Sequence, residues 1–313
     1  MLSTGLCNQL QIKYPLFQGG MAWISDAELA GAVSNAGGLG IIAAGNAPPE
    51  WLEEEVYKIR KLTDRPFGVN IMLMSPYKDA VAEAAAFLEV PVIVTGAGSP
   101  GKYMPLWKSK GIKVFPVVPT VTMAVRLERT GADGLICEGT EAGGHIGELT
   151  TMALIPQVVD AVRIPVVAAG GIADARGFAA ALMLGASGVQ IGTRFLTAFE
   201  CNVHPNYKQA ILNAKDTDAV VSGRSTGHPI RCLRNRLTSK IKKMEKSGST
   251  IELIEKEGAG ALRLAAVEGD ARSGSVMAGQ IAGLVKQESS CEEIITDLIQ
   301  GTANLIGGFQ LEK

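Results

Sequence analysis

The chain has 313 residues, of which 47% are hydrophobic and 19% charged, with 30 Lys and Arg against 31 Asp and Glu. The net charge of −1 argues against electrostatic binding to nucleic acid or to a membrane surface. No apolar stretch approaches the roughly 20 residues that a membrane span needs, and the first ten residues lack the pattern of a secretion signal. We therefore expect a cytoplasmic protein, with one large α/β domain or one plus a smaller domain.

The five cysteines and three histidines are scattered, and none of them has metal-ligand spacing. We predict a reduced protein with no bound metal. Cys137 lies next to Glu138 and could be considered a nucleophile, but a small buried strand residue is the more typical role of a free cysteine.

Apolar runs and helical patterns alternate along the first 200 residues. The runs that predict buried parallel strands are Pro15–Gly20, Leu39–Gly45, Phe67–Leu73, Pro91–Gly96, Lys113–Pro119, Gly134–Gly139, Ile164–Gly171 and Val189–Phe195. Helices are predicted between them at Asp26–Ala36, Pro49–Leu62, Pro76–Leu88, Tyr103–Lys110, Val121–Thr130, Thr151–Val162 and Ala175–Leu184. Eight strands separated by seven helices indicate a (β/α)8 TIM barrel. The alternative is a doubly wound open sheet, which typically has fewer strands and a nucleotide fingerprint.

The segment 201–270 interrupts this alternation and predicts a small helical insertion that covers the barrel mouth, with the barrel formed by 1–200 and 271–313. Pro229–Lys246 has the pattern of one amphipathic helix, and a second helix follows from Ile251 to about Glu268, with an interruption at Gly258–Gly260. The polar face of the first helix is strongly basic, with one acid, Glu245, against Arg231, Arg234, Arg236, Lys240, Lys242, Lys243 and Lys246. It is either a docking surface for an acidic partner or an ordinary solvated face.

Function in a TIM barrel lies at the carboxyl ends of the strands. In this chain those ends carry glycines and small amides, at Gln18–Trp23, Gly45–Asn46, Asn70, Thr95–Gly98, Pro119–Thr120, Glu138–His145, Ala169–Gly171 and Gln190–Thr193. Such a set suits a large, flat ligand that is held mostly by backbone groups. The segment Glu138–His145 is the most informative, because it combines a carboxylate, several glycines and an imidazole.

The loops after the seventh and eighth strands often bind phosphate in TIM barrels. Here they contain Ala169, Gly170 and Gly171, and then Gln190, Gly192 and Thr193, which can form an anion nest. A flat ligand with a phosphate tail is most simply FMN. Two dinucleotide-like glycine patterns, at Gly38–Ala43 and Gly96–Gly101, lack the strand and acidic context of a Rossmann site.

These residues resemble those of the flavin-dependent enoyl-[acyl-carrier-protein] reductases, within the nitronate monooxygenase (2-nitropropane dioxygenase-like) flavoproteins. The resemblance runs from about Tyr14 to Gly301. The motifs that carry it are Gln18–Met21, Gly40–Pro48, Phe67–Leu73, Glu138–His145, Ala169–Gly171, Gly192–Arg194, His204–Lys208 and Gly274–Gly283.

The resemblance implies roles for individual residues. Met21, Ala22 and Asn70 are expected to face the flavin ring, Glu138 to bind near the ring or ribityl chain, and Ala142 and Gly143 to pack beside it. Gly170, Gly171, Gly192 and Thr193 are expected to hold the phosphate, Met277 and Gln280 to close over the site, and His145 to face the substrate. Asn46, Ala169 and Gln190, at neighbouring strand ends, complete the expected cofactor-binding set.

The expected activity is reduction of a trans-2-enoyl-[acyl-carrier-protein] with FMN and either NADPH or NADH, in bacterial fatty-acid elongation. The partners would be the acyl carrier protein and a second copy of the chain in a homodimer. His145 would assist proton transfer or bind the thioester carbonyl. Nitronate monooxygenase is the alternative activity, with His145 as a base, and a non-catalytic flavin-binding regulator is a third hypothesis.

Overall fold

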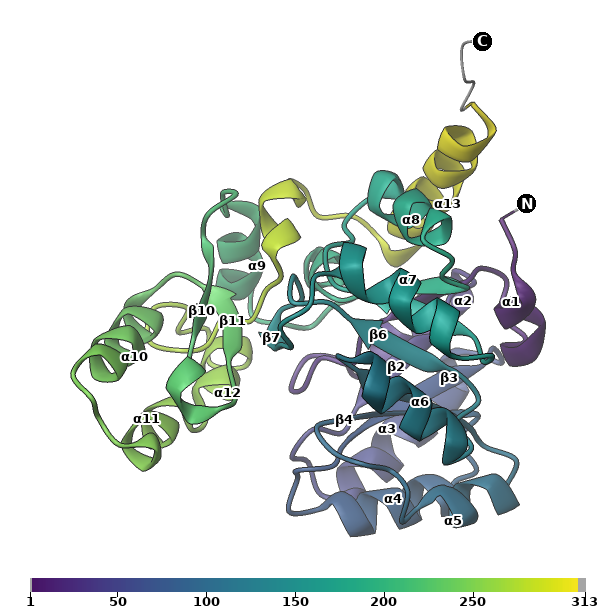
Figure 1. Cartoon of the computed structure of the whole chain (residues 1–313), viewed down its shortest axis with the longest axis horizontal. Helices are drawn as coiled ribbons and strands as arrows, with labels where there is room; N and C mark the ends of the chain where they lie inside the picture. The colour runs from purple at the N-terminus through teal and green to yellow at the C-terminus, as the bar shows by residue number, and fades with distance from the viewer. Residues whose placement is uncertain (1, 309–313) are drawn as a thin grey trace.

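The computed structural model describes residues 2–308, so Met1 and the last five residues of the predicted barrel segment 271–313 lie outside it. Eight parallel strands form its central sheet (Figure 1). They are β1 (Leu16–Gln18), β2 (Gly40–Ala43), β3 (Phe67–Met72), β4 (Val92–Gly96), β5 (Lys113–Val118), β6 (Leu135–Glu138), β8 (Val166–Ala169) and β9 (Gly188–Ile191). Their order is β1-β9-β8-β6-β5-β4-β3-β2, and a parallel bridge between Phe17 and Leu39 joins the two ends. The predicted TIM barrel is confirmed.

Helices cover the outside of the barrel at the predicted places. They are α2 (Ala27–Asn35), α3 (Pro49–Leu62), α4 (Lys78–Phe87), α5 (Met104–Ser109), α6 (Val121–Arg129), α7 (Thr151–Ala161) and α8 (Ala175–Met183). Asp26 and Asp174 cap α2 and α8 by accepting backbone N–H bonds from Leu29 and Arg176. None of the described helices is long and apolar enough to cross a membrane.

The barrel interior is filled by side chains and is closed at its amino-terminal end. The rings of Phe17 and Phe115 meet edge to face inside it, with centroids 5.6 Å apart. Helix α1 (Gly5–Leu10) buries Leu6 and Leu10 in the same core. A ligand of the barrel therefore has to bind at the opposite end, where the strands finish.

The insertion contains strands as well as helices. Its elements are α9 (Pro205–Leu212), β10 (Ala219–Ser222), the 3-10 helix η2 (Arg224–Thr226), β11 (Ile230–Leu233), α10 (Arg236–Lys246), α11 (Ile251–Gly258) and α12 (Ala261–Ala266). The single predicted helix Pro229–Lys246 is wrong in its first part, because Ile230–Leu233 is a strand and the helix begins after Asn235. Asn235 starts α10 with a capping box to Thr238.

Strand β11 explains this difference, because it has partners on both edges. It pairs antiparallel with β10 on one side and, on the other, with β7 (Gly144–His145), a short strand from the loop after β6. We call residues 201–270 the lid. The predicted division between the lid and the barrel stays a prediction, since the lid sheet includes a strand of the barrel loop.

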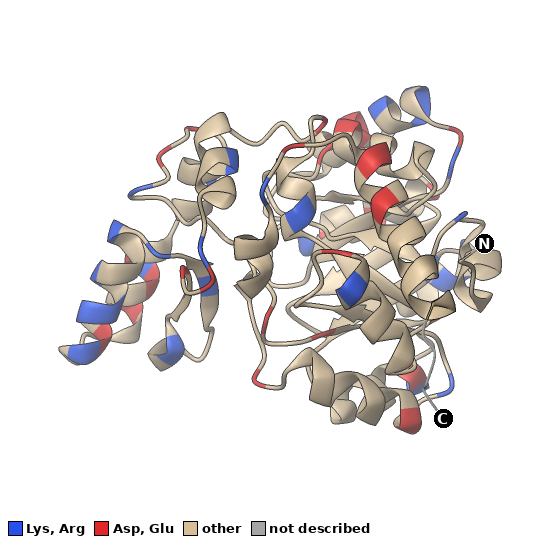
Figure 2. Ribbon diagram, turned by 90° about the horizontal axis from the view of Figure 1, so that it is seen from above, with Lys and Arg blue, Asp and Glu red and all other residues tan. Residues whose placement is uncertain are grey.

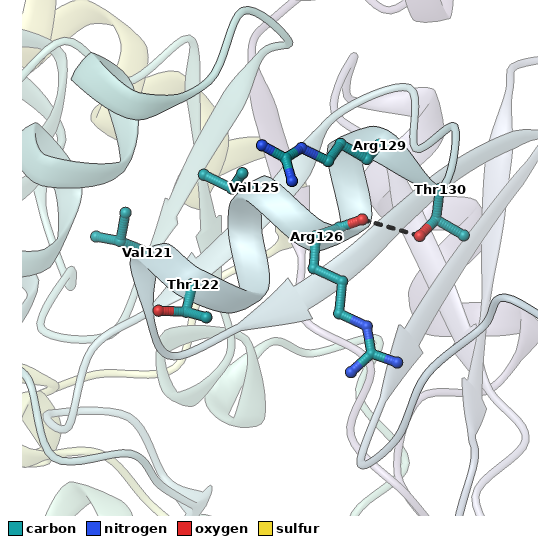
Figure 3. A pocket seen from close by; sticks show the side chains of 6 residues that line it. All are labelled: Val121, Thr122, Val125, Arg126, Arg129 and Thr130. Atoms are coloured by element: carbon teal, nitrogen blue, oxygen red, sulfur yellow. Dashed lines mark hydrogen bonds between the residues drawn. The ribbon is translucent and has the colours of Figure 1, made fainter.

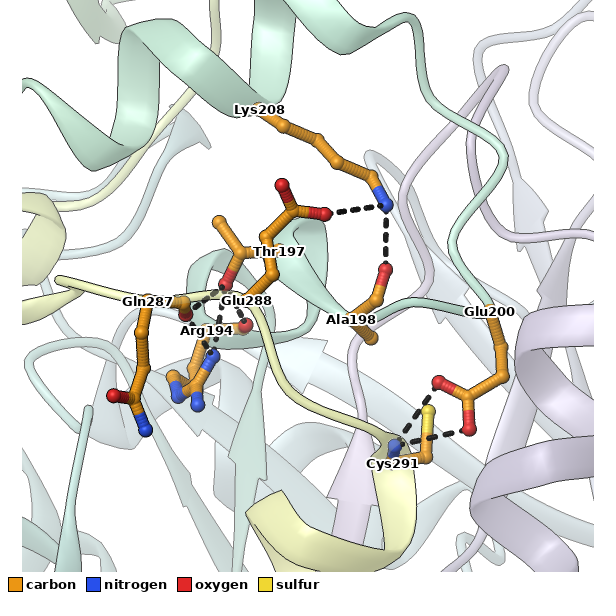
Figure 4. Close-up of polar contacts among 8 residues, drawn as sticks. All are labelled: Arg194, Thr197, Ala198, Glu200, Lys208, Gln287, Glu288 and Cys291. Atoms are coloured by element: carbon orange, nitrogen blue, oxygen red, sulfur yellow. Dashed lines mark hydrogen bonds and ion pairs between the residues drawn. The ribbon is translucent and has the colours of Figure 1, made fainter.

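The lid is fastened to the barrel where the chain leaves and rejoins it (Figure 4). After β9, the 3-10 helix η1 (Thr193–Thr197) carries Arg194, whose guanidinium donates to the hydroxyl of Thr197 and to that of Ser289. Lys208 donates to the carbonyl of Ala198 at 2.7 Å. The chain returns through 273–279 and the 3-10 helix η3 (Gln280–Leu284), and then forms the last helix, α13 (Cys291–Gly307).

Candidate active site at the barrel mouth

A buried glutamine shapes the first loop of the mouth. Gln18 is fully buried, donates to the Ser25 hydroxyl at 2.8 Å and accepts from the amide of Ile41 at 3.0 Å. The Ser25 hydroxyl in turn accepts from the amide of Met21 at 2.9 Å. This network fixes the backbone of Met21 at the end of β1, and contact of Met21 and Ala22 with a flavin stays a prediction.

Three buried polar atoms at the mouth have no hydrogen-bond partner among the described residues. They are Oδ1 of Asn70, Oγ1 of Thr95 and Oε1 of Gln190, at the ends of β3, β4 and β9. Burial of an unpaired polar group costs about 1–3 kcal/mol, so native proteins rarely leave such groups without a partner. Their convergence at one end of the barrel indicates a ligand with polar edges. Asn70 and Gln190 were predicted for this site, whereas Thr95 was recognised only as part of a strand end.

The glycines after β8 and β9 leave room that a side chain would fill. Gly170 and Gly171 have φ values of 88° and 73°, which other residues rarely adopt. A Cβ at Gly170 would lie 2.8 Å from the carbonyl oxygen of Gly139, and one at Gly19 would lie 3.5 Å from Cα of Gly192. Backbone groups can therefore approach a ligand closely here, next to Ala169, which ends β8. The arrangement fits the predicted phosphate nest.

Glu138 ends β6, and its half-buried carboxyl has no hydrogen-bond partner among residues 2–308. Burial raises its pKa to about 7. At neutral pH the group is thus close to half-protonated, and it can both donate and accept a hydrogen bond. The neighbouring Cys137 is completely buried, and burial raises its pKa to about 12. The prediction of a structural role for this thiol agrees with that environment.

His145 lies on β7, with its backbone paired to Ile230 of the lid strand β11. Its side chain is exposed at the surface. Desolvation by the surrounding atoms lowers its pKa, and the nearby His228 lowers it further. His145 is therefore mostly neutral near pH 7, with one ring nitrogen as donor and the other as acceptor. His204 has a local role, because its Nδ1 accepts from the amide of Asn206.

Arg231 holds the loop that leads to His145. It is only 5% exposed, and its Nε and one terminal nitrogen donate to the carbonyl of Thr140 at 3.1 and 2.9 Å. The charge of Glu141 lies near it. Its assignment to the exposed basic face was wrong, because strand β11 turns this side chain into the protein. The run of basic residues in Pro229–Lys246 gave no indication that Arg231 would be buried and bound to the Thr140 loop.

The returning segment closes the site from the other side. The Thr193 hydroxyl accepts from the amide of Gly279 at 2.9 Å, and the amide of Gln280 donates to the carbonyl of Glu141 at 2.9 Å. The Gln280 side chain is exposed, whereas Met277 is half-buried. Met277 also lies beside β7, because a Cβ on Gly144 would be 3.4 Å from its sulfur.

The remaining predicted residues lie around this core of the site. Ala142 is buried in the loop after β6, and Gly143 packs against the backbone of Ala278, which a Cβ would meet at 2.7 Å. Asn46 is exposed and lines a cavity beside the mouth. Within residues 2–308, no three histidine, cysteine or acidic side chains come together as a metal site.

A separate concave surface of about 600 Å³ lies along helix α6 and does not belong to this site (Figure 3). Its lining residues come from one helix and the residue after it. They are Val121, Thr122, Val125, Arg126, Arg129 and Thr130. The two arginine side chains point in different directions, so no polar groups converge there.

The comparisons with known proteins agree with this geometry. A family model described as nitronate monooxygenase matches residues 3–301. The chain belongs to the nitronate monooxygenase family. A "Probable nitronate monooxygenase" from Staphylococcus saprophyticus subsp. saprophyticus is 36% identical, and the match covers 92% of this chain and 95% of that protein.

Two solved structures of similar proteins extend this result. FabK from Thermotoga maritima is 45% identical with a TM-score of 0.96, and the match covers 98% of each chain. A nitroalkane oxidase from Streptomyces ansochromogenes is 27% identical with a TM-score of 0.86, and the match covers 97% of this chain and 99% of the other. The family therefore contains proteins named for different reactions on the same barrel, and this chain is an oxidoreductase of that family.

Glu138→Gln tests the environment of the carboxyl. Because the folded-state pKa is raised from 4.5 to about 7, the wild-type protein without cofactor should lose stability as pH rises from 4.5 to about 7. The loss is on the order of 2 kcal/mol. Glu138→Gln should lack this part of the pH dependence. Urea unfolding of both proteins between pH 5 and 8 measures the difference, and parallel curves would contradict the assignment.

Arg231→Met should remove both donors of the Thr140 carbonyl. We expect the free energy of unfolding to fall by about 1–3 kcal/mol, and the His145 loop to become more sensitive to proteolysis. Arg234→Met is the matched control, because Arg234 is exposed and donates only to the carbonyl of Thr217. Arg234→Met should lower the free energy of unfolding by no more than about 0.5 kcal/mol. Equal losses in the two variants would show that Arg231 does not hold the loop.

Proposed function

We propose that the protein is an FMN-dependent enoyl-[acyl-carrier-protein] reductase that uses NADPH or NADH, acts in bacterial fatty-acid elongation, and works in the cytoplasm as a homodimer. The observation that carries the proposal is the match to FabK, which is closer in sequence and in fold than the match to the nitroalkane oxidase. The site geometry supports a flavin enzyme of either kind.

The residues at the mouth fit FMN. The unpaired oxygens of Asn70 and Gln190 can accept hydrogen bonds from the polar edge and side chain of a flavin, and the unpaired Thr95 hydroxyl can donate or accept. The backbone at Gly170, Gly171 and Gly192, with the Thr193 hydroxyl, would hold the phosphate. Thr193 accepts from Gly279 and keeps its own proton to donate. When bound, FMN supplies hydride-transfer chemistry, and the protein supplies orientation and electrostatics.

The protein groups near the mouth suit the second part of the reaction. Reduction of the double bond adds a hydride at the β-carbon and a proton at the α-carbon, and negative charge develops on the thioester carbonyl. A neutral His145 can donate a hydrogen bond to that oxygen or help to deliver the proton. Arg231 and the β7–β11 pairing keep His145 in place.

Nitronate monooxygenase activity is the second candidate, because the family and the Staphylococcus saprophyticus relative carry that name. A neutral His145 can equally act as a base on a nitroalkane. The non-catalytic regulator does not explain the unpaired polar atoms and the raised pKa of Glu138 as well as an enzyme does.

An activity comparison tests the proposal. The purified protein should carry FMN, identified by the mass of the extracted cofactor. Crotonyl thioester should accelerate oxidation of NADH or NADPH, and alkyl nitronate should cause little oxygen uptake. The reverse result would support the nitronate activity, and FAD or no flavin would contradict the site itself.

His145→Ala should retain FMN and lose about 10²–10⁴-fold in enoyl reduction. The reason is that the side chain is assigned to the substrate, while the cofactor residues lie elsewhere. Stopped-flow measurement of enoyl-dependent oxidation of the reduced protein isolates this step. His204→Ala, which removes a helix cap far from the chemistry, is the control. A wild-type rate in His145→Ala would exclude His145 from the reaction.

The exposed lysines of α10 are the proposed docking surface for the acyl carrier protein. Figure 2 shows blue and red segments of the ribbon mixed in this part of the lid. Lys240 is paired with Glu257 at 2.6 Å, so the field of the helix is weaker than its sequence indicates. Lys243 and Lys246 are exposed and have no ion-pair partner among the described residues.

Reversal of Lys243 and Lys246 to glutamate should raise the KM for a carrier-protein-linked enoyl substrate and leave the KM for a small neutral enoyl thioester nearly unchanged. The effect should weaken with added salt, because exposed charges act over about 10 Å at 0.1 M salt. Arg126→Glu with Arg129→Glu, on the distant helix α6, is the control. Equal effects on the KM of both substrates would contradict a docking role and would indicate that α10 is an ordinary solvated surface helix.

A further inference from the structure

A second cavity, of about 410 Å³, lies between the barrel rim and the lid. Its barrel side comes from Trp23–Asp26 and from the segment after β2, and its lid side includes Asn202 and Arg263. The volume falls in the range of about 300–1,000 Å³ that is typical of small-molecule sites. The cavity is adjacent to the mouth. Asn46 lines it, and the preceding residue, Gly45, packs so closely against Ala22 that a Cβ added to Gly45 would lie 2.9 Å from the Cβ of Ala22.

Two tryptophans give this cavity aromatic surface. Trp23 has φ of 66°, which is unusual for a bulky residue, and 45% of it is exposed. The amides of Ile24 and Ser25 both donate to the carbonyl of Met21, and this tight turn imposes the conformation. Backbone strain of this kind, about 1–3 kcal/mol, is concentrated at functional sites. Trp51, from the first turn of α3, lines the same cavity.

Polar groups complete the lining. The Asp26 carboxylate accepts from the side-chain amide of Asn202 at 2.9 Å, which links the barrel to the lid. The guanidinium of Arg263 lies 5.8 Å from the centroid of the Trp23 ring and is paired with Glu268 on the lid. Glu55 also lines the cavity, but its oxygens are already bonded to the Ala27 amide and to Lys58.

We propose that this cavity binds the adenosine-phosphate half of the nicotinamide dinucleotide that reduces the enzyme. The proposal rests on the proposed reductase function. The nicotinamide ring has to reach the barrel mouth, so the rest of the dinucleotide has to extend to an adjacent space. The tryptophans offer stacking surface for the adenine, the side-chain oxygen of Asn202 offers an acceptor for its amino edge or for the ribose, and Arg263 offers a cation for phosphate. The pantetheine arm of a carrier protein has no aromatic ring for this surface.

Direct binding is the first test. Titration of the FMN-loaded protein with 5′-AMP, followed by calorimetry, should show saturable binding, and ribose 5-phosphate should bind at least about tenfold more weakly, because the base contributes most of the stacking. Trp23→Gly removes the ring and also suits the left-handed backbone, and it should weaken 5′-AMP binding about tenfold. Arg263→Gln leaves the barrel untouched and should weaken it as well. Arg272→Gln, an exposed arginine just after the lid and outside the cavity, is the control.

Kinetics with a truncated donor is the second test. Trp23→Gly and Arg263→Gln should each raise the KM for the dinucleotide about tenfold, and change the KM for reduced nicotinamide mononucleotide less than about twofold. Absence of 5′-AMP binding together with an unchanged dinucleotide KM would overturn the proposal. A raised KM for the enoyl thioester instead would assign the cavity to the pantetheine arm and also overturn it.

One measurement separates this proposal from the proposed function. Protein reduced with dithionite needs no nicotinamide donor, and crotonyl thioester should reoxidise the wild type, Trp23→Gly and Arg263→Gln at similar rates. Failure of the wild type in this step would contradict the reductase function, whatever the 5′-AMP result. Normal reoxidation without 5′-AMP binding would contradict only the assignment of the cavity.

Discussion

The pairing of β7 with β11 is the contact on which the candidate site depends. It takes the loop after β6 out of the barrel and makes it the edge of the lid sheet, so that the position of His145 is set by two parts of the chain at once. Arg231 reinforces the same contact from inside the lid, because its guanidinium binds the carbonyl of Thr140. Any motion of the lid therefore acts on the loop that carries the imidazole.

Charge is reduced next to the space proposed for the flavin. Burial raises the pKa of Glu138 to about 7, so this carboxyl is about half protonated at pH 7, and desolvation lowers the pKa of His145, which favours its neutral form. Neutral groups that can both donate and accept hydrogen bonds suit a reaction in which charge develops and then disappears. The unpaired polar atoms of the strand ends indicate a ligand with polar edges at these positions.

The family resemblance and the structure agree on the barrel fold, but the fold alone does not determine which reaction the site carries out. A barrel of this family can carry proteins named for nitronate, nitroalkane and FabK reactions, which is the expected behaviour of a fold whose loops determine function. What distinguishes the candidates lies around the flavin position. The cavity with Trp23 and Arg263 matters for this reason, because a reductase needs a place for its electron donor and an oxygen-using enzyme does not.

The barrel could be read from the sequence because its signals are local. Each strand is a short apolar run, the helices have their own periodicity and some have side-chain caps, and the chain order places all strand ends at one mouth. For the same reason Asn70, Glu138 and Gln190 could be assigned to that mouth.

Strand β11 and the buried Arg231 could not be predicted, because Pro229–Lys246 has a helical pattern by itself and the edges that convert Ile230–Leu233 into a strand come from β10 and from distant β7. Burial of Arg231 and the cavity at Trp23 likewise depend on contacts between the lid and the barrel. The sequence by itself determined the barrel and the residues at its mouth. Only the tertiary structure decided how the lid contacts those residues, because hydrogen bonds between strands far apart along the chain outweigh the local helical propensity of the lid segment.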